Sequence, residues 1–165
     1  MLTFLPTSLR GIGIDLGRLA AVDDGLSAQL ASNVAAYDPA AGEHPFVQLR
    51  YDEIGEGDLD RMLGYAGIAT ANRPLGLPYD FSPITAPGSD GDDWRLYPLS
   101  GLLVHVRSAE PAAFEMRDQY GSLDALFRSL ENDGHDVTAG QYLALTLAEA
   151  IGFCHNRGLG LATHW

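Results

Sequence analysis

The C-terminal third of the chain has the clearest pattern of apolar and polar positions. Ser122, a residue type that favours helix N-caps, precedes four apolar residues spaced three and four positions apart. These residues are Leu123, Leu126, Phe127 and Leu130. Such spacing places them on one face of a helix. We therefore expect a helix that follows Ser122 and ends at Gly134.

A second helix is expected directly afterwards. Thr138 and Gln141 have the spacing of a capping box, in which both side chains bind free amides at a helix start. The stretch Tyr142–Arg157 is apolar on nearly every side, which predicts a deeply buried core helix. Gly158 is expected to close this helix, and Leu159–Trp165 to form a terminal strand.

The middle of the chain predicts strands. Trp94–Leu99 and Gly101–Arg107 are expected as two strands around a Ser100-Gly101 turn, and the second is apolar enough for a central strand. Phe114–Gln119 alternates apolar and polar residues, which favours a third strand, although Pro111 can also open a helical turn. Together these segments predict an antiparallel meander.

The N-terminal part of the chain predicts shorter elements. Leu9–Val22 predicts one or two short strands, followed by turn residues at Asp23-Asp24-Gly25. Ser27 is expected to cap a helix that stops before Asp38-Pro39. The alternation in Phe46–Tyr51 is typical of a half-buried strand.

Two further segments lie before the meander. Asp58 is expected to cap a short helix that ends at Gly67. Its apolar stripe consists of Leu59, Met62, Leu63 and Ala66. The segment 72–93 has no periodic pattern and is rich in proline and glycine, so we expect a long irregular loop. Loops of that length are uncommon in compact domains and are often functional.

These elements predict an α+β fold. A chain of 165 residues fits one ordinary domain, so we expect a single domain over residues 1–165. Its core would combine an antiparallel sheet with two packed C-terminal helices.

The charge balance narrows the choice of partners. The chain has 22 acidic and ten basic residues, a net charge of -12, and all ten basic residues are arginine. Nucleic acids and anionic membranes are bound mainly through lysine and arginine, so neither is expected as a partner. The absence of lysine also removes Schiff-base chemistry and the P-loop lysine. A basic protein or a cation is favoured instead.

Cysteine content and the N-terminus favour a cytoplasmic location. Cys154 is the only cysteine, so no intrachain disulfide can form. The first residues lack a basic segment followed by a long apolar one, as a signal peptide requires. Cys154 itself is expected to be a small buried apolar residue.

The string GIGIDLG at residues 11–17 resembles the first-strand phosphate loop of the actin and sugar-kinase family. It also resembles the opening strand of small Holliday-junction resolvases with an RNase-H-like fold. In both families the aspartate that matches Asp15 binds a divalent metal. The chain is too short for the two lobes of the kinases. The resolvase length fits, but the later acidic residues have no matching context and the net charge opposes DNA binding.

A small enzyme or ligand-binding domain is the alternative function. Its pocket would lie under the 72–93 loop, with Asp15, His105 and His155 as polar candidates chosen by residue type. His105 is expected on a strand, facing away from Val104 and Val106. No serine, cysteine or carboxylate near a histidine has the context of a catalytic set, so we expect no cofactor, no metal and no catalytic residue.

Two acidic clusters are the stronger candidates for a binding surface. The first consists of Asp52, Glu53, Glu56, Asp58 and Asp60, and the second of Asp90, Asp92 and Asp93. If they converge in the fold, carboxylates and aromatic residues would form one patch suited to a basic protein face. The candidate partner-binding residues are Asp52, Glu53, Glu56, Asp58, Asp60, Tyr79, Phe81, Asp90, Asp92, Asp93 and Trp94.

The leading hypothesis is therefore a non-enzymatic acidic binding protein that masks a basic surface of its partner. The order of a tryptophan-bearing strand, two further strands and the helix after Ser122 is similar to the end of some bacterial toxin-immunity proteins. That similarity includes no diagnostic motif. It implies an immunity or inhibitor protein whose partner is a toxin.

Overall fold

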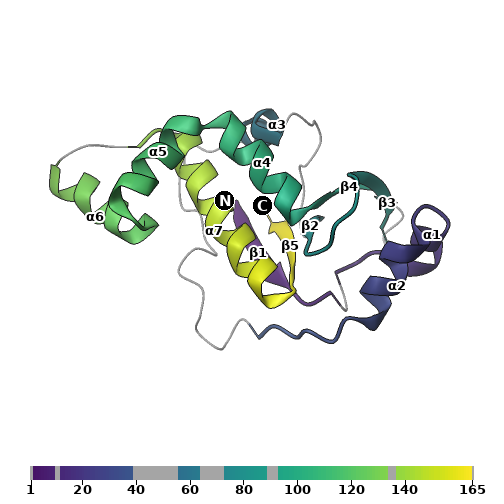
Figure 1. The fold of residues 1–165 in the computed structure, drawn as a ribbon. Coiled ribbons are helices and arrows are strands. Elements are labelled where there is room, and N and C mark those ends of the chain that lie inside the picture. The colour runs from purple at the N-terminus through teal and green to yellow at the C-terminus, as the bar shows by residue number, and fades with distance from the viewer. Residues whose placement is uncertain are drawn as a thin grey trace.

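The computed structural model describes residues 2–9, 12–38, 56–63, 73–88, 93–133 and 137–164. Within these ranges the chain forms a five-stranded sheet with helices, so the α+β class is confirmed (Figure 1). The predicted strand Phe46–Tyr51 and the helix ends predicted at Gly67 and Gly134 lie outside the described residues.

The sheet is mixed rather than purely antiparallel. Its strands are β1 (Thr3–Thr7), β2 (Arg73–Leu77), β3 (Ile84–Pro87), β4 (Asp93–Pro98) and β5 (Gly160–His164), in the spatial order β1-β5-β2-β4-β3. The β2–β4 pair is parallel, and the other pairs are antiparallel. The expectation of an antiparallel sheet therefore holds only in part.

Seven helices accompany the sheet in the described part of the chain. They are α1 (Leu16–Ala20), α2 (Asp24–Ser32), α3 (Glu56–Leu63), α4 (Leu99–Ala109), α5 (Pro111–Tyr120), α6 (Leu123–Asp133) and α7 (Ala139–Arg157). Helix α7 packs against β1 and β5, and α4 packs against β2, β4 and α7. Figure 1 shows α1 and α2 at the end of the molecule that carries β3 and β4, with α6 at the opposite end.

Two hydrophobic clusters lie on opposite faces of the sheet. Leu96 and Tyr97 are neighbours on β4, and successive strand residues point to opposite faces. Tyr97 belongs to the larger cluster, with α3, α4 and α7. Leu96 belongs to the smaller cluster, with Leu19 of α1 and Leu26 of α2. The pair α1–α2 therefore covers the face of β4 that α4 and α7 leave open.

In the C-terminal third, the predicted starts of both helices, the end of the second helix at Gly158 and the strand that follows it are confirmed. The Ser122 hydroxyl accepts a hydrogen bond from the Ala125 amide at 3.1 Å at the start of α6. The capping box of α7 is complete, with Gln141 N to Thr138 Oγ1 at 3.2 Å and Thr138 N to Gln141 Oε1 at 3.0 Å. Gly158 ends α7 with a positive φ of 66°, and β5 follows.

Two strands predicted for the meander are wrong, because both segments are helices. Gly101–Arg107 lies within α4, where Leu99, Leu102 and Val106 are buried at helical spacing. A dense apolar run fits a buried helix as well as a central strand, so periodicity alone does not distinguish them. Phe114–Gln119 lies within α5, which Pro111 opens at its first position.

The N-terminal predictions also need correction. The described residues of Leu9–Val22 include no strand: Ile14 makes an isolated bridge with Gly88, and α1 follows it. The segment 72–93, expected as one irregular loop, contains β2 and β3. Its prolines did not exclude strands, because proline is tolerated at strand ends and at irregularities. Leu59, Met62 and Leu63 are buried on α3, as the predicted stripe required.

Candidate functional site

Two aspartates position the helices at the β3–β4 end of the molecule. Asp15 caps α1, and its Oδ1 accepts a hydrogen bond from the Arg18 amide at 3.1 Å. Asp23 caps α2, and its Oδ1 accepts from the Leu26 amide at 2.9 Å. Carboxylates suit these positions because the N-terminus of a helix carries partial positive charge and free amides. The predicted cap Ser27 instead lies inside α2 and donates to the Leu16 carbonyl at 2.8 Å.

The bridge between Ile14 and Gly88 joins this corner to the sheet. It places Asp15 beside the end of β3, where Pro87 pairs with Asp93 of β4. Helix α1 also packs against α2 and β3, so the N-termini of α1 and α2 lie at the same end of the molecule as the start of β4, and this part is here called the acidic end. Its described members are Asp15, Asp23, Asp24 and Asp93.

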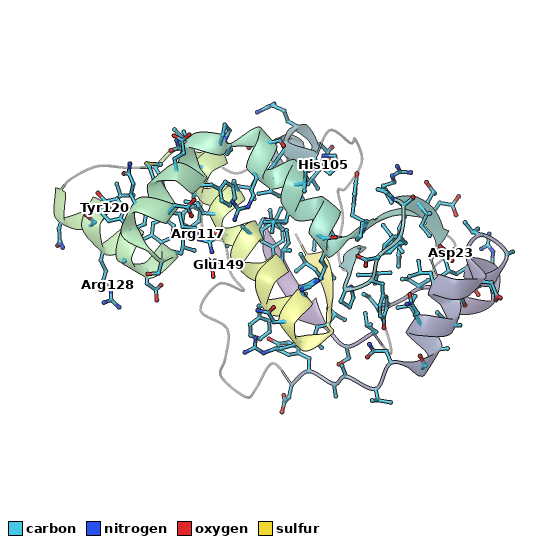
Figure 2. All side chains as sticks on the ribbon, viewed as in Figure 1. Asp23, His105, Arg117, Tyr120, Arg128 and Glu149 are labelled. Atoms are coloured by element: carbon cyan, nitrogen blue, oxygen red, sulfur yellow. The ribbon has the colours of Figure 1, made fainter. Side chains whose placement is uncertain are left out.

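Figure 2 shows Asp23 at the same end of the molecule as α1 and α2. Asp24 and Asp93 are exposed, whereas Asp15 and Asp23 are partly buried by their capping role. Arg18 lies in the same corner and is exposed. The sequence reasoning assigned Asp23-Asp24 to a turn and missed this surface, although a pair of aspartates before an apolar stripe is also a helix-start signal.

The first acidic cluster occupies a different element. Asp58 and Asp60 lie on α3, which packs against α4 and α7, and Glu56 begins that helix. Asp58 accepts a hydrogen bond from Arg61 at 3.1 Å, so part of its charge is offset within the helix. Helix α3 is thus a different element from α1, α2 and β4, which carry the acidic end. The remaining candidates Asp52, Glu53, Asp90 and Asp92 lie outside the described residues.

The predicted aromatic anchors are mostly inside the fold. Trp94 is only 6% exposed on β4. Phe81 and Tyr79 are partly buried against the smaller hydrophobic cluster. Tyr79 keeps its side chain at the surface of this cluster, and its hydroxyl accepts from Asn33 Nδ2 at 2.7 Å and donates to the Gln29 carbonyl at 3.3 Å.

A shallow, open hollow lies beside Tyr79 at the C-terminal end of α2. Its volume is about 390 Å³, and Val34 in its wall is 78% exposed. The residues that line it are Gln29, Ser32, Asn33, Val34, Ala35 and Tyr79. The pocket expected under the 72–93 loop had other candidate residues, and Tyr79 was expected only as a partner-binding aromatic residue. The α2 residues of the hollow were not expected, because Asn33 and Tyr79 are 46 positions apart in the chain.

The three polar residues of the enzyme alternative lie on three separate elements. Asp15 caps α1, His105 lies on α4 with its ring 5.8 Å from that of Tyr97, and His155 is exposed in the last turn of α7. His105 thus lies on a helix, and the strand predicted for it is wrong. None of the three lines the hollow. Among the described residues, no group of three or more His, Cys, Asp or Glu is placed to hold a metal ion.

Cys154 lies in the core and is fully buried on α7. Burial raises the pKa of its thiol from 9.0 to about 12, an effect that nearby Arg157 opposes. The thiol is therefore protonated at neutral pH and is a poor nucleophile.

No helix in the described part of the chain is long and apolar enough to cross a membrane. No protein family model, curated protein or solved structure matches the chain.

Proposed function

We propose that this protein is a non-enzymatic binding protein that covers a basic surface of a partner protein in the cytoplasm. An immunity or inhibitor protein acting on a basic toxin is the class that fits this description. The observation that supports the proposal is the placement of Asp15, Asp23, Asp24 and Asp93 at one end of the molecule, in a chain of net charge -12.

An acidic surface mainly increases the rate at which a basic partner associates with it. Like charges gathered at one end create a potential that attracts a basic partner before contact, and salt weakens that attraction. The range is about 10 Å at 0.1 M salt, so carboxylates close together act jointly on an approaching charge. Asp24 and Asp93 are exposed and accessible to such a partner.

The negative charge of the acidic end favours a protein over a nucleic acid or an anionic membrane as the partner. Nucleic acids and anionic lipid surfaces would be repelled by the acidic end, and affinity for either depends on basic clusters. A protein with a positive face gains from the acidic end and supplies apolar contacts as well.

The test compares two variants that each remove three negative charges. The first changes Asp23→Asn, Asp24→Asn and Asp93→Asn, and asparagine at position 23 retains the capping oxygen. The matched control changes Glu115→Gln, Asp118→Asn and Asp124→Asn, which are exposed on α5 and α6.

Each tagged chain is used to capture proteins from native cytosol at low ionic strength, followed by mass spectrometry. The expected result is a basic protein that the wild type and the control recover and that the first variant loses, with recovery declining as salt rises. Equal recovery by both variants, or no recovered protein at low ionic strength, would contradict the proposal.

A further inference from the structure

The hollow beside Tyr79 lies at a helix end that lacks its own positive charge. Helix α2 ends at Ser32, with Asn33 as its C-cap, and its last turn contains no basic residue. The C-terminus of a helix carries partial negative charge. In α2 the Gln29 carbonyl accepts from the Ser32 and Tyr79 hydroxyls and the Leu30 carbonyl accepts from the Asn33 amide, but no basic side chain of the helix offsets that charge. This end of α2 forms one wall of the hollow through Gln29, Ser32 and Asn33.

Tyr79 contributes an aromatic ring to the lining of the hollow. Its hydroxyl is held between Asn33 Nδ2 at 2.7 Å and the Gln29 carbonyl at 3.3 Å, which fixes the ring relative to the helix end. The face of an aromatic ring is electron-rich and attracts a cation placed over it. The helix end and the ring therefore favour the same kind of occupant.

The end of α7 shows how this chain combines the same components. There, the Arg157 guanidinium lies 3.7 Å from the centroid of the Phe153 ring, in the last turn of the helix. The two helix ends are neighbours, because Asn33 Nδ2 also approaches the Gly158 carbonyl at 3.5 Å. Helix α7 thus carries its own arginine on an aromatic ring, whereas α2 has the ring of Tyr79 and no basic residue in its last turn.

We infer that this hollow receives an arginine side chain from the basic partner, an inference that rests on the proposed function. The guanidinium would lie against Tyr79 and donate to carbonyls at the end of α2, while its aliphatic stem contacts Val34 and Ala35. Val34, at 78% exposed, offers apolar surface that such a stem would cover. Arginine fits better than lysine because its planar group both stacks on a ring and donates several hydrogen bonds.

The test uses two variants with the same change of charge at two exposed valines. Val34→Arg places a cation in the wall of the hollow, and Val104→Arg places one on α4, where Val104 is 64% exposed. Both positions are exposed, so circular dichroism should show both variants folded. A fluorescently labelled hexa-arginine peptide serves as the probe, and its affinity is measured by anisotropy at low ionic strength.

The expected result is that Val34→Arg weakens peptide affinity about tenfold, while Val104→Arg weakens it by less than about twofold, since only the former blocks a cation–π site. Tyr79→Leu should also weaken affinity, and hexa-lysine should bind less tightly than hexa-arginine. In NMR spectra of the wild type, the peptide should shift the amide signals of residues 29–35 and 79.

Equal effects of the two valine variants, or peptide-induced shifts confined to other residues, would overturn the inference. In that case the proposed function still stands if the captured basic partner depends on Asp23, Asp24 and Asp93. Conversely, if the wild-type chain captures no basic protein, the proposed function is contradicted. The comparison of the two valine variants with the peptide would then still decide whether the hollow binds arginine.

Discussion

The substitution Gly160→Ala tests how the smaller hydrophobic cluster packs against the sheet. Gly160 begins β5 and pairs with Thr7 of β1. A methyl group added there would lie under 3.0 Å from Ile12 Cδ1, 2.9 Å from Leu9 Cδ2 and 3.5 Å from the Thr7 carbonyl oxygen. Ordinary carbon contacts lie near 3.5–4.0 Å. Ile12 and Leu9 are 6% and 5% exposed, so both must move within a packed interior.

We expect Gly160→Ala to lower the free energy of unfolding by about 1–3 kcal/mol, the usual cost of overpacking a core. For a chain of this size, that corresponds to a fall in Tm of about 2–12 °C. Replacing a strand glycine would otherwise help, by about 0.5–1 kcal/mol, so the measured loss is the difference between the two effects. Urea denaturation and calorimetry give both quantities.

Gly152→Ala is the matched control on α7. No heavy atom lies within 4 Å of a methyl group placed at Gly152, so its effect reports helix propensity alone. The expected change is a gain of up to about 1 kcal/mol. The two glycine substitutions should therefore change the free energy of unfolding in opposite directions, and this is the first result to check.

A double-mutant cycle identifies the atom responsible. Ile12→Val removes the Cδ1 atom that the new methyl group would meet, and alone it should cost about 0.5–1.5 kcal/mol. The double variant should then be more stable than the sum of the single effects by about 1 kcal/mol. Additive effects, or a Gly160→Ala protein as stable as the wild type, would refute the reasoning.

Three further predictions follow from single residues. Because burial raises the pKa of Cys154 from 9.0 to about 12, only the unfolded chain ionises between these values; stability should fall as pH rises through this window, by about 1.4 kcal/mol per unit. Cys154→Ala should flatten that part of the pH–stability curve measured by urea denaturation. Thr138→Ala removes one half of the capping box and should cost about 1 kcal/mol, whereas Thr138→Ser should not, as thermal melts will show. Leu102→Ala, at a fully buried position on α4, should cost about 2–5 kcal/mol in the same assay, and a loss below 1 kcal/mol would exclude the packing described for α4.

The candidate site was only partly predictable from the sequence. Net charge is a sum over the chain, so the expectation of a basic partner needed no structure. Asp93 and Tyr79 were named in advance, but their neighbours were not. Ile14, next to Asp15, forms its bridge with Gly88 across 74 positions, and Tyr79 contacts Asn33 across 46 positions. Sequence spacing carries no information about such long-range pairs unless a motif specifies them.

The sequence alone determined the local structure of the C-terminal third. The capping box at Thr138, the αL glycine at Gly158 and the stripe on α6 depend on contacts within a few residues, so their signals survive without tertiary context. Only the tertiary structure decided that the apolar run in α4 is a helix. The run Leu102–Val106 satisfies either a central strand or a helix buried against α7, and the choice depends on which surfaces surround it. The same holds for the mixed sheet, because the parallel pairing of β2 with β4 is a contact between distant segments that neither segment specifies by itself.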